Sequence, residues 1–240
     1  MGSWLLLLLL AMTVLAGCGG QGTPQPLLFG QAPWPDGERS TYTLTNADGQ
    51  QAGSVVYALD SVTGADGEAW QLVRTITALG SQETMTITMD AAGFRPQASQ
   101  LERVNAGARE TVDAIYTGGQ VDMTLTTRQN IMTVQREQVP SDARETVALP
   151  MLLRALPLAK GYVTQINTFL PVAPQLERIT VRVTGEETVQ VPAGSFATWA
   201  VELDAGDAQS KAWIAQEAPY LLVKYIDGRN KATLELSGVQ

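Results

Sequence analysis

The sequence predicts a mainly β protein, an antiparallel meander forming a curved half-barrel or barrel-like sheet, with a short helical segment around residues 141–157. Apolar and polar residues alternate with a period of two along most of the chain, and turn residues separate these stretches at short intervals. The alternation is interrupted between Pro140 and Pro157. One face of each strand is therefore expected to pack inward while the other meets water.

The first half of the chain contains the clearest strand, 84–89, in which apolar residues alternate with threonines. The same alternation predicts the other strands of this half, with Asp48-Gly49 suited to a tight hairpin turn. These strands are expected at 41–45, 54–60, 70–76, 97–104, 109–116, 121–127 and 131–137.

An apolar cluster follows Pro150, and Pro157 stops any helix that begins there. We expect one or two short helical turns that cap the open mouth or the concave face of the sheet; a buried crossover loop is the alternative. A hairpin around Gly185 is expected in the second half. Strands are predicted there at 162–170, 179–183, 188–191, 197–203, 211–215, 221–226 and 232–236.

The N-terminus contains an apolar run, 4–15, followed by Leu15-Ala16-Gly17-Cys18 and the only cysteine of the chain. This run is shorter than the roughly 20 residues that span a bilayer, and it suits an exported signal peptide. The segment resembles a bacterial lipobox. That resemblance implies cleavage between Gly17 and Cys18, a diacylglycerol unit on the Cys18 thiol, and an acyl group such as palmitate on its amine. A secretory signal with a coincidental cysteine is the alternative.

Three regions follow from these patterns: a lipoprotein signal peptide at 1–17, a lipidated N-terminus and flexible tether at 18–36, and a single β domain at 37–240. The tether is rich in Gly, Pro and Gln and has no periodicity. The expected partner is a membrane, reached through the lipid anchor. The expected location is the cell envelope, either the periplasmic face of an outer membrane or the cell surface, depending on the envelope type.

Composition excludes several classes of function. The formal net charge of −8 argues against a nucleic-acid partner. The chain has no histidine, and with Cys18 lipidated no cysteine remains free, so catalysis through Ser-His or Cys-His pairs and zinc-histidine sites are excluded. Carboxylates could still act in a hydrolase, but Glu186-Glu187 is expected in a solvated turn. We therefore expect no enzyme, no metal site and no cofactor beyond the covalent lipid.

Several segments resemble a family of exported bacterial proteins of unknown function, and the resemblance covers most of the chain after the signal. They include the opening 37–42, the segment 152–161, and the turn 191–196 with the strands that follow it. The family in turn has a weaker similarity to the lipoprotein-localisation carriers. In those carriers a curved antiparallel sheet wraps an apolar cavity closed by short helices. The resemblance implies a fold and no catalytic residues.

Methionines and tryptophans mark a possible apolar pocket, because an unbranched, polarizable side chain suits an adaptable cavity. The candidates are Met85, Met89, Met123, Met132, Met151, Trp70 and Trp213. Ordinary core packing explains the same residues. Two functions stay open: a non-catalytic module that binds an apolar ligand or lipid in the envelope, and an envelope structural or protein-interaction module with a filled β core. The sequence does not determine the oligomeric state.

Overall fold

A computed structural model describes residues 22–240 and places fifteen strands in one curved sheet. The order of strands across the sheet is β8-β7-β6-β5-β4-β3-β2-β1-β15-β14-β13-β12-β11-β10-β9. Neighbouring strands run antiparallel, except that the two-residue strand β9 pairs parallel with β10. The sheet is thus two meanders that meet where β1 pairs with β15.

The first meander runs outward from the middle of the sheet to the edge strand β8. Its strands are β1 (Glu38–Thr45), β2 (Gln51–Gly64), β3 (Gly67–Ala78), β4 (Ser81–Asp90), β5 (Pro96–Asn105), β6 (Ala108–Thr117), β7 (Gln120–Thr126) and β8 (Met132–Gln138). The hairpin of β2 and β3 has an uninterrupted register that places Tyr57 opposite Arg74, whereas the β1–β2 and β4–β5 pairs each contain one register shift.

The chain then crosses the concave face before it builds the second meander. The crossover holds β9 (Arg144–Glu145), η1 (Thr146–Ala148), α1 (Leu149–Leu152) and η2 (Leu153–Ala155). The second meander consists of β10 (Val163–Leu170), β11 (Gln175–Val191), β12 (Gly194–Asp204), β13 (Gln209–Ala215), β14 (Leu222–Ile226) and β15 (Thr233–Val239).

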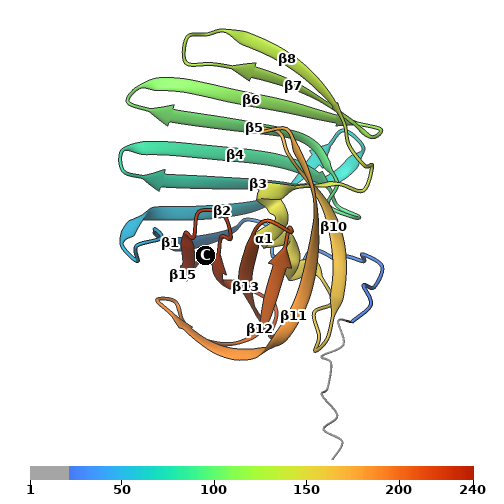
Figure 1. Cartoon of the computed structure of the whole chain (residues 1–240), viewed down its shortest axis with the longest axis vertical. Coiled ribbons are helices and arrows are strands. Elements are labelled where there is room, and N and C mark those ends of the chain that lie inside the picture. The colour runs from blue at the N-terminus through green and yellow to red at the C-terminus, as the bar shows by residue number, and fades with distance from the viewer. Residues whose placement is uncertain (1–21) are drawn as a thin grey trace, which may run out of the picture.

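The two meanders curl towards each other, and Figure 1 shows α1 between the stacked strands of the first and the curved strands of the second. All four residues of α1 are buried, with Pro150 in its first turn, where a missing N–H costs no hydrogen bond. The main core gathers the inward residues of both meanders around this helix. The helical segment therefore serves as the centre of the core.

The predicted fold class is confirmed, and so is its short helical segment, which is buried within the crossover and does not merely cap the sheet. The hairpin expected at Gly185 is wrong. One strand, β11, runs straight through it, and the register against β12 shifts between Val183 and Gly185. Glu186 and Glu187 thus lie within a strand, beside a β-bulge, and not in a turn. Glycine marks both features, so its presence alone does not distinguish them.

The segment expected as a flexible tether is packed against the domain over its described part. The Gln25 N–H donates to the Val163 carbonyl at 2.7 Å, and the Gly30 N–H donates to the Ala155 carbonyl at 2.7 Å. Trp34 is buried, with its ring 5.4 Å from that of Phe94. Apolar anchors within a Pro- and Gly-rich stretch order it despite its lack of periodicity. The signal peptide, Gly17 and Cys18 lie outside the described residues.

Candidate functional site

A cavity of about 470 Å³ opens between the two meanders. One wall is the inner face of β1–β5, and the facing wall comes from β10–β15 together with their turns. The helical crossover supplies a third side through η1 and the start of α1. A volume of this size lies within the usual range for small-molecule sites.

Most of the lining is aliphatic, because the alternating pattern of each strand turns one apolar face towards the helix. The apolar lining residues of the first meander are Leu44, Val55, Ile76, Met85 and Leu101; those of the crossover and second meander include Val147, Leu149, Leu170, Val172, Ile179, Leu203 and Leu234. Such a surface favours the burial of a hydrocarbon ligand, because both surfaces are removed from water.

Polar side chains interrupt this lining at one place on the first wall. Tyr57, Arg74 and Met85 lie directly opposite one another on β2, β3 and β4. Cross-strand partners share a face of the sheet, so the Arg74 guanidinium lies between a tyrosine and a methionine on the cavity side. The next row brings Glu83 opposite Arg103.

Two arginines share the carboxylate of Glu83. The Arg74 Nη2 atom is 2.6 Å from one Glu83 oxygen, and the Arg103 Nη2 atom is 2.7 Å from the other. Glu110 is a more distant second partner of Arg103, at 3.7 Å. These charges are arranged as a chain across β3–β6, and Arg74 is its most inward member.

Two tyrosines, the buried Tyr57 and the half-buried Tyr225, complete the polar part of the cavity. Burial raises the pKa of the Tyr57 hydroxyl, against the opposing effect of the nearby Arg74 guanidinium. Burial also raises the pKa of the Tyr225 hydroxyl. Both groups therefore stay protonated at neutral pH and keep an O–H to donate.

The opposite rim carries a second group of charges on the turns of the second meander. Arg229 is held by Glu177 and by Asp207, the latter at 3.0 Å. The Asp227 carboxylate accepts the backbone N–H groups of Arg229 and Asn230 at 2.7 and 3.1 Å. This rim thus has more carboxylates than cations.

The predicted pocket residues divide sharply. Met85 lines the cavity. Met89 and Met151 are fully buried in the main core, and Met123 is buried in a second cluster beneath Phe169. The sequence correctly predicts that they point inward. These three side chains are packed in the core, however, and do not line the cavity as the pocket hypothesis expects.

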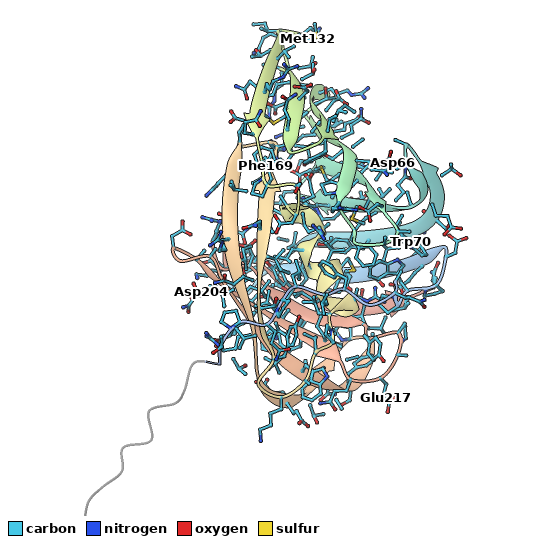
Figure 2. The ribbon with its side chains drawn as sticks, turned by 90° about the vertical axis from the view of Figure 1, so that its right-hand side faces the viewer. Asp66, Trp70, Met132, Phe169, Asp204 and Glu217 are labelled. Atoms are coloured by element: carbon cyan, nitrogen blue, oxygen red, sulfur yellow. The ribbon has the colours of Figure 1, made fainter. Side chains whose placement is uncertain are left out.

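Met132 and the two tryptophans lie elsewhere. Met132 is 68% exposed on β8, at the tip of the sheet in Figure 2. Trp70 packs edge-on against Trp34, with the ring centroids 5.9 Å apart. Trp213 donates its indole N–H to Glu187 at 2.7 Å. Their assignment to the pocket is wrong: β8 extends past the second meander, and both indoles pack beside other groups.

Sequence reasoning missed the polar residues of the site. Arg74 sits at an inward position of a strand whose neighbouring inward residues, Leu72 and Ile76, are apolar. A charged residue at an inward position needs either a partner or a function. That departure from the alternation is the signal that could have identified Arg74.

A separate buried carboxyl, Glu145, ends β9 directly before η1 and does not line the cavity. Burial raises its pKa to about 8, although the Tyr116 hydroxyl donates a hydrogen bond to it. Its second oxygen is buried without a partner. A carboxyl with a raised pKa is one of the two carboxyl groups that a glycoside hydrolase of this type requires. The described residues hold no group of three or more potential metal ligands.

A protein family matches most of this chain. The family model described as a protein of unknown function, DUF3108, matches residues 41–236. The chain belongs to the DUF3108 family. The resemblance of the sequence to a family of unknown function is thereby confirmed, and no curated protein matches this DUF3108 chain.

Three solved structures are similar to this DUF3108 chain at low sequence identity. A β-barrel-like DUF1849 protein from Brucella abortus has a TM-score of 0.53 at 14% identity, covering 85% of this chain and 97% of its own. A candidate exported protein with a YmcC-like fold from Bacteroides fragilis has a TM-score of 0.30 at 10% identity, covering 89% and 100%.

A third structure is a candidate lipoprotein from Parabacteroides distasonis, with a TM-score of 0.32 at 11% identity, covering 88% of this chain and 99% of its own. Of these three, the Brucella structure is similar enough to bear on the fold, and it agrees with the curved sheet. No helix among residues 22–240 is long and apolar enough to cross a membrane.

Proposed function

We propose that this DUF3108 protein is a non-catalytic binding module of the cell envelope that holds an apolar ligand or lipid between its two meanders. The cavity of about 470 Å³ carries this proposal. A sheet whose only task were to be rigid would fill that space, because a void forfeits dispersion contacts along its lining.

The proposal includes an anchor at Cys18, which rests on the lipobox-like sequence 15–18. Gln25, bound to the start of β10, is seven residues beyond Cys18. An extended chain covers at most about 3.6 Å per residue, so the start of β10 lies within roughly 25 Å of the anchor. An anchored domain would thus face the membrane with the end of the molecule that contains 156–163.

Ligand binding is tested with the chain from Gly19 onward, which retains every contact of the described residues. Purified without detergent, it is titrated with the fluorescent apolar probe N-phenylnaphthylamine, and its organic extract is analysed by mass spectrometry. We expect saturable binding at one site. Absence of both saturable binding and co-purified lipid would contradict the proposal.

A matched pair of variants places the probe. Ala208→Trp puts a large ring into the cavity from the half-buried turn between β12 and β13 and should lower probe affinity at least tenfold. Ala65→Trp adds the same ring to the exposed turn between β2 and β3, outside the lining, and should leave affinity unchanged. Equal effects of the two variants would locate binding outside the cavity.

The anchor has its own test in the full-length chain. Cells are fed an alkyne-tagged palmitate, and the protein is followed by click labelling and by membrane fractionation. We expect label and membrane retention, both lost in Cys18→Ser. Retention of both in that variant would exclude Cys18 as the attachment point. This result would not bear on ligand binding in the cavity.

A second function, an envelope protein-interaction module, is favoured by β8. Val134 is 70% exposed, Met132 is similarly exposed, and the outer edge of β8 pairs with no other strand of the described chain. Exposed edges accept partner strands. A photocrosslinking residue at Gln135 in the native membrane should capture one protein if this is the function, and none if β8 is only an edge.

A further inference from the structure

The cavity walls carry opposite charge. On β3 and β5 two guanidiniums, Arg74 and Arg103, share the one carboxylate of Glu83 at 2.6 and 2.7 Å. Glu110 approaches only Arg103, at 3.7 Å, from the side remote from Arg74. The inward end of this charge chain is therefore positive.

Arg74 has donors to spare. One of its nitrogens binds Glu83, and its Nε atom is buried with no hydrogen-bond partner. A guanidinium presents five N–H donors in a planar fork, which matches a carboxylate or a phosphate. An anion on the cavity side of Arg74 would use donors that the described residues leave free.

The two tyrosines add donors at the same place. Tyr57 lies directly opposite Arg74 on the neighbouring strand, and Tyr225 lines the cavity from β14. Tyr42 and Tyr116 donate hydrogen bonds to protein oxygens, whereas the Tyr57 hydroxyl lies beside the Arg74 guanidinium and the Tyr225 hydroxyl beside Ser210, both of which can donate to them, so each tyrosine O–H stays available to a ligand. Tyr57 is nevertheless almost fully buried.

The facing rim disfavours an anion. Glu177 and Asp207 both hold Arg229, and Asp227, whose charge also reaches the hydroxyls of Tyr57 and Tyr225, is bound to backbone N–H groups of its own turn. Among the rim residues that line the cavity, the carboxylates of Glu177 and Asp227 outnumber the one cation, Arg229, so an acidic group is less favoured there than beside Arg74 on the wall of β3. The charge distribution thus gives a ligand in the cavity one preferred direction.

We propose that the ligand is a single-chain amphiphile whose anionic head, a carboxylate or a phosphate, binds Arg74 while its hydrocarbon chain lies along the aliphatic lining. This inference rests on the proposed function and adds the chemical class of the ligand. Tyr57 and Tyr225 donate to the same head. A cavity of about 470 Å³ lies in the range of small-molecule sites, and a ligand with one acyl chain is of that class.

The test compares ligands that share a chain and differ in the head. N-phenylnaphthylamine bound to the chain from Gly19 is displaced with palmitate, hexadecanol or methyl palmitate, with palmitate below its critical micelle concentration and the two neutral ligands below their solubility limits. Because a hydrogen bond to a charged group contributes more than one to a neutral group, palmitate should displace the probe at an at least roughly tenfold lower concentration than hexadecanol.

Arg74→Gln removes the charge and keeps a shorter polar side chain that ends in an amide. It should raise the palmitate concentration required about tenfold and leave hexadecanol unchanged. Arg39→Gln is the matched control, because Arg39 pairs with Asp60 on β1 and β2 outside the cavity lining. It should change neither ligand. Circular dichroism melting confirms that each variant is folded.

The outcomes separate the head from the cavity. Equal displacement by palmitate and hexadecanol, with no effect of Arg74→Gln, would overturn the anionic head and leave the proposed function standing. Failure of the probe itself to bind would overturn both. A parallel arm with 1-palmitoyl-lysophosphatidate identifies the head: tighter binding than palmitate assigns a phosphate, and weaker binding a carboxylate.

Discussion

Arg154 and Glu38 form an ion pair at the centre of the molecule, with Nη1 and Oε1 2.6 Å apart and side chains 0% and 1% exposed. Arg154 also donates to the carbonyls of Pro219 and Tyr220 at 3.1 Å each. Its guanidinium lies 5.5 Å from the ring centroid of Trp34. One side chain of η2 thus connects β1, the turn before β14, and the N-terminal segment.

Arg154→Met should destabilise the protein by about 3–5 kcal/mol, because it leaves the Glu38 carboxylate buried without its cation. Glu38→Leu should cost a similar amount. The double variant should cost clearly less than the sum, since no isolated charge remains. Urea unfolding of all four proteins measures the coupling, and strict additivity would contradict the role assigned to the pair.

Glu145 should make stability depend on pH. Its folded pKa is raised by burial from 4.5 to about 8, so between these values the folded state holds a proton that the unfolded state releases. The stabilisation from this group is therefore complete below pH 4.5 and is lost as pH rises through about 8.

Glu145→Gln keeps an oxygen that accepts the Tyr116 hydroxyl and cannot ionise. The variant should match the wild type near pH 4.5 and exceed its free energy of unfolding by a few kcal/mol, order of magnitude, at pH 8. Urea unfolding at several pH values measures the difference. Glu137→Gln, in the fully exposed strand β8, serves as the control. A constant difference across pH would contradict the assignment.

Trp34 should be a stability determinant although it precedes the first strand. It is buried against Phe94 and Trp70, so Trp34→Ala should cost about 3–5 kcal/mol. Leu28→Ala, at a position 67% exposed in the same segment, should stay within about 0.5 kcal/mol. Thermal unfolding of the two variants separates them. Equal, small effects would restore the view of this segment as a loose tether.

Local pattern predicts most of the strands because a period of two and its turn residues depend only on neighbours in sequence. The pairing of β1 with β15 cannot be predicted in this way, since Ser40 pairs with Val239 across nearly the whole chain. The position of the cavity also depends on contacts between residues distant in sequence. Met85 and Met89 are both inward on β4, yet only the packing of the second meander decides that Met85 faces space and Met89 faces filled core.

The sequence shows buried charges as polar residues within apolar segments, but it does not identify the residues that pair with them. Arg154 stands alone in the apolar segment Leu152-Leu153-Arg154-Ala155-Leu156, which indicates a buried cation. Its carboxylate, Glu38, is 116 residues away, and the cross-chain packing that joins them has no local signature. Sequence thus predicts that a partner exists, and the fold is needed to name it.

Chain length should control the affinity of the proposed ligand. Each buried methylene contributes about 0.8 kcal/mol, or roughly fourfold in affinity, so a series of saturated fatty acids should bind more tightly with length until the cavity is full. Beyond that length the affinity should level off. Leu101→Ala enlarges the lining and should move the plateau to longer chains, whereas Ala208→Trp should move it to shorter ones. Probe displacement measures the series. Affinity that rises without a plateau, or a plateau that neither variant moves, would show that the chains partition onto a surface and do not enter the cavity.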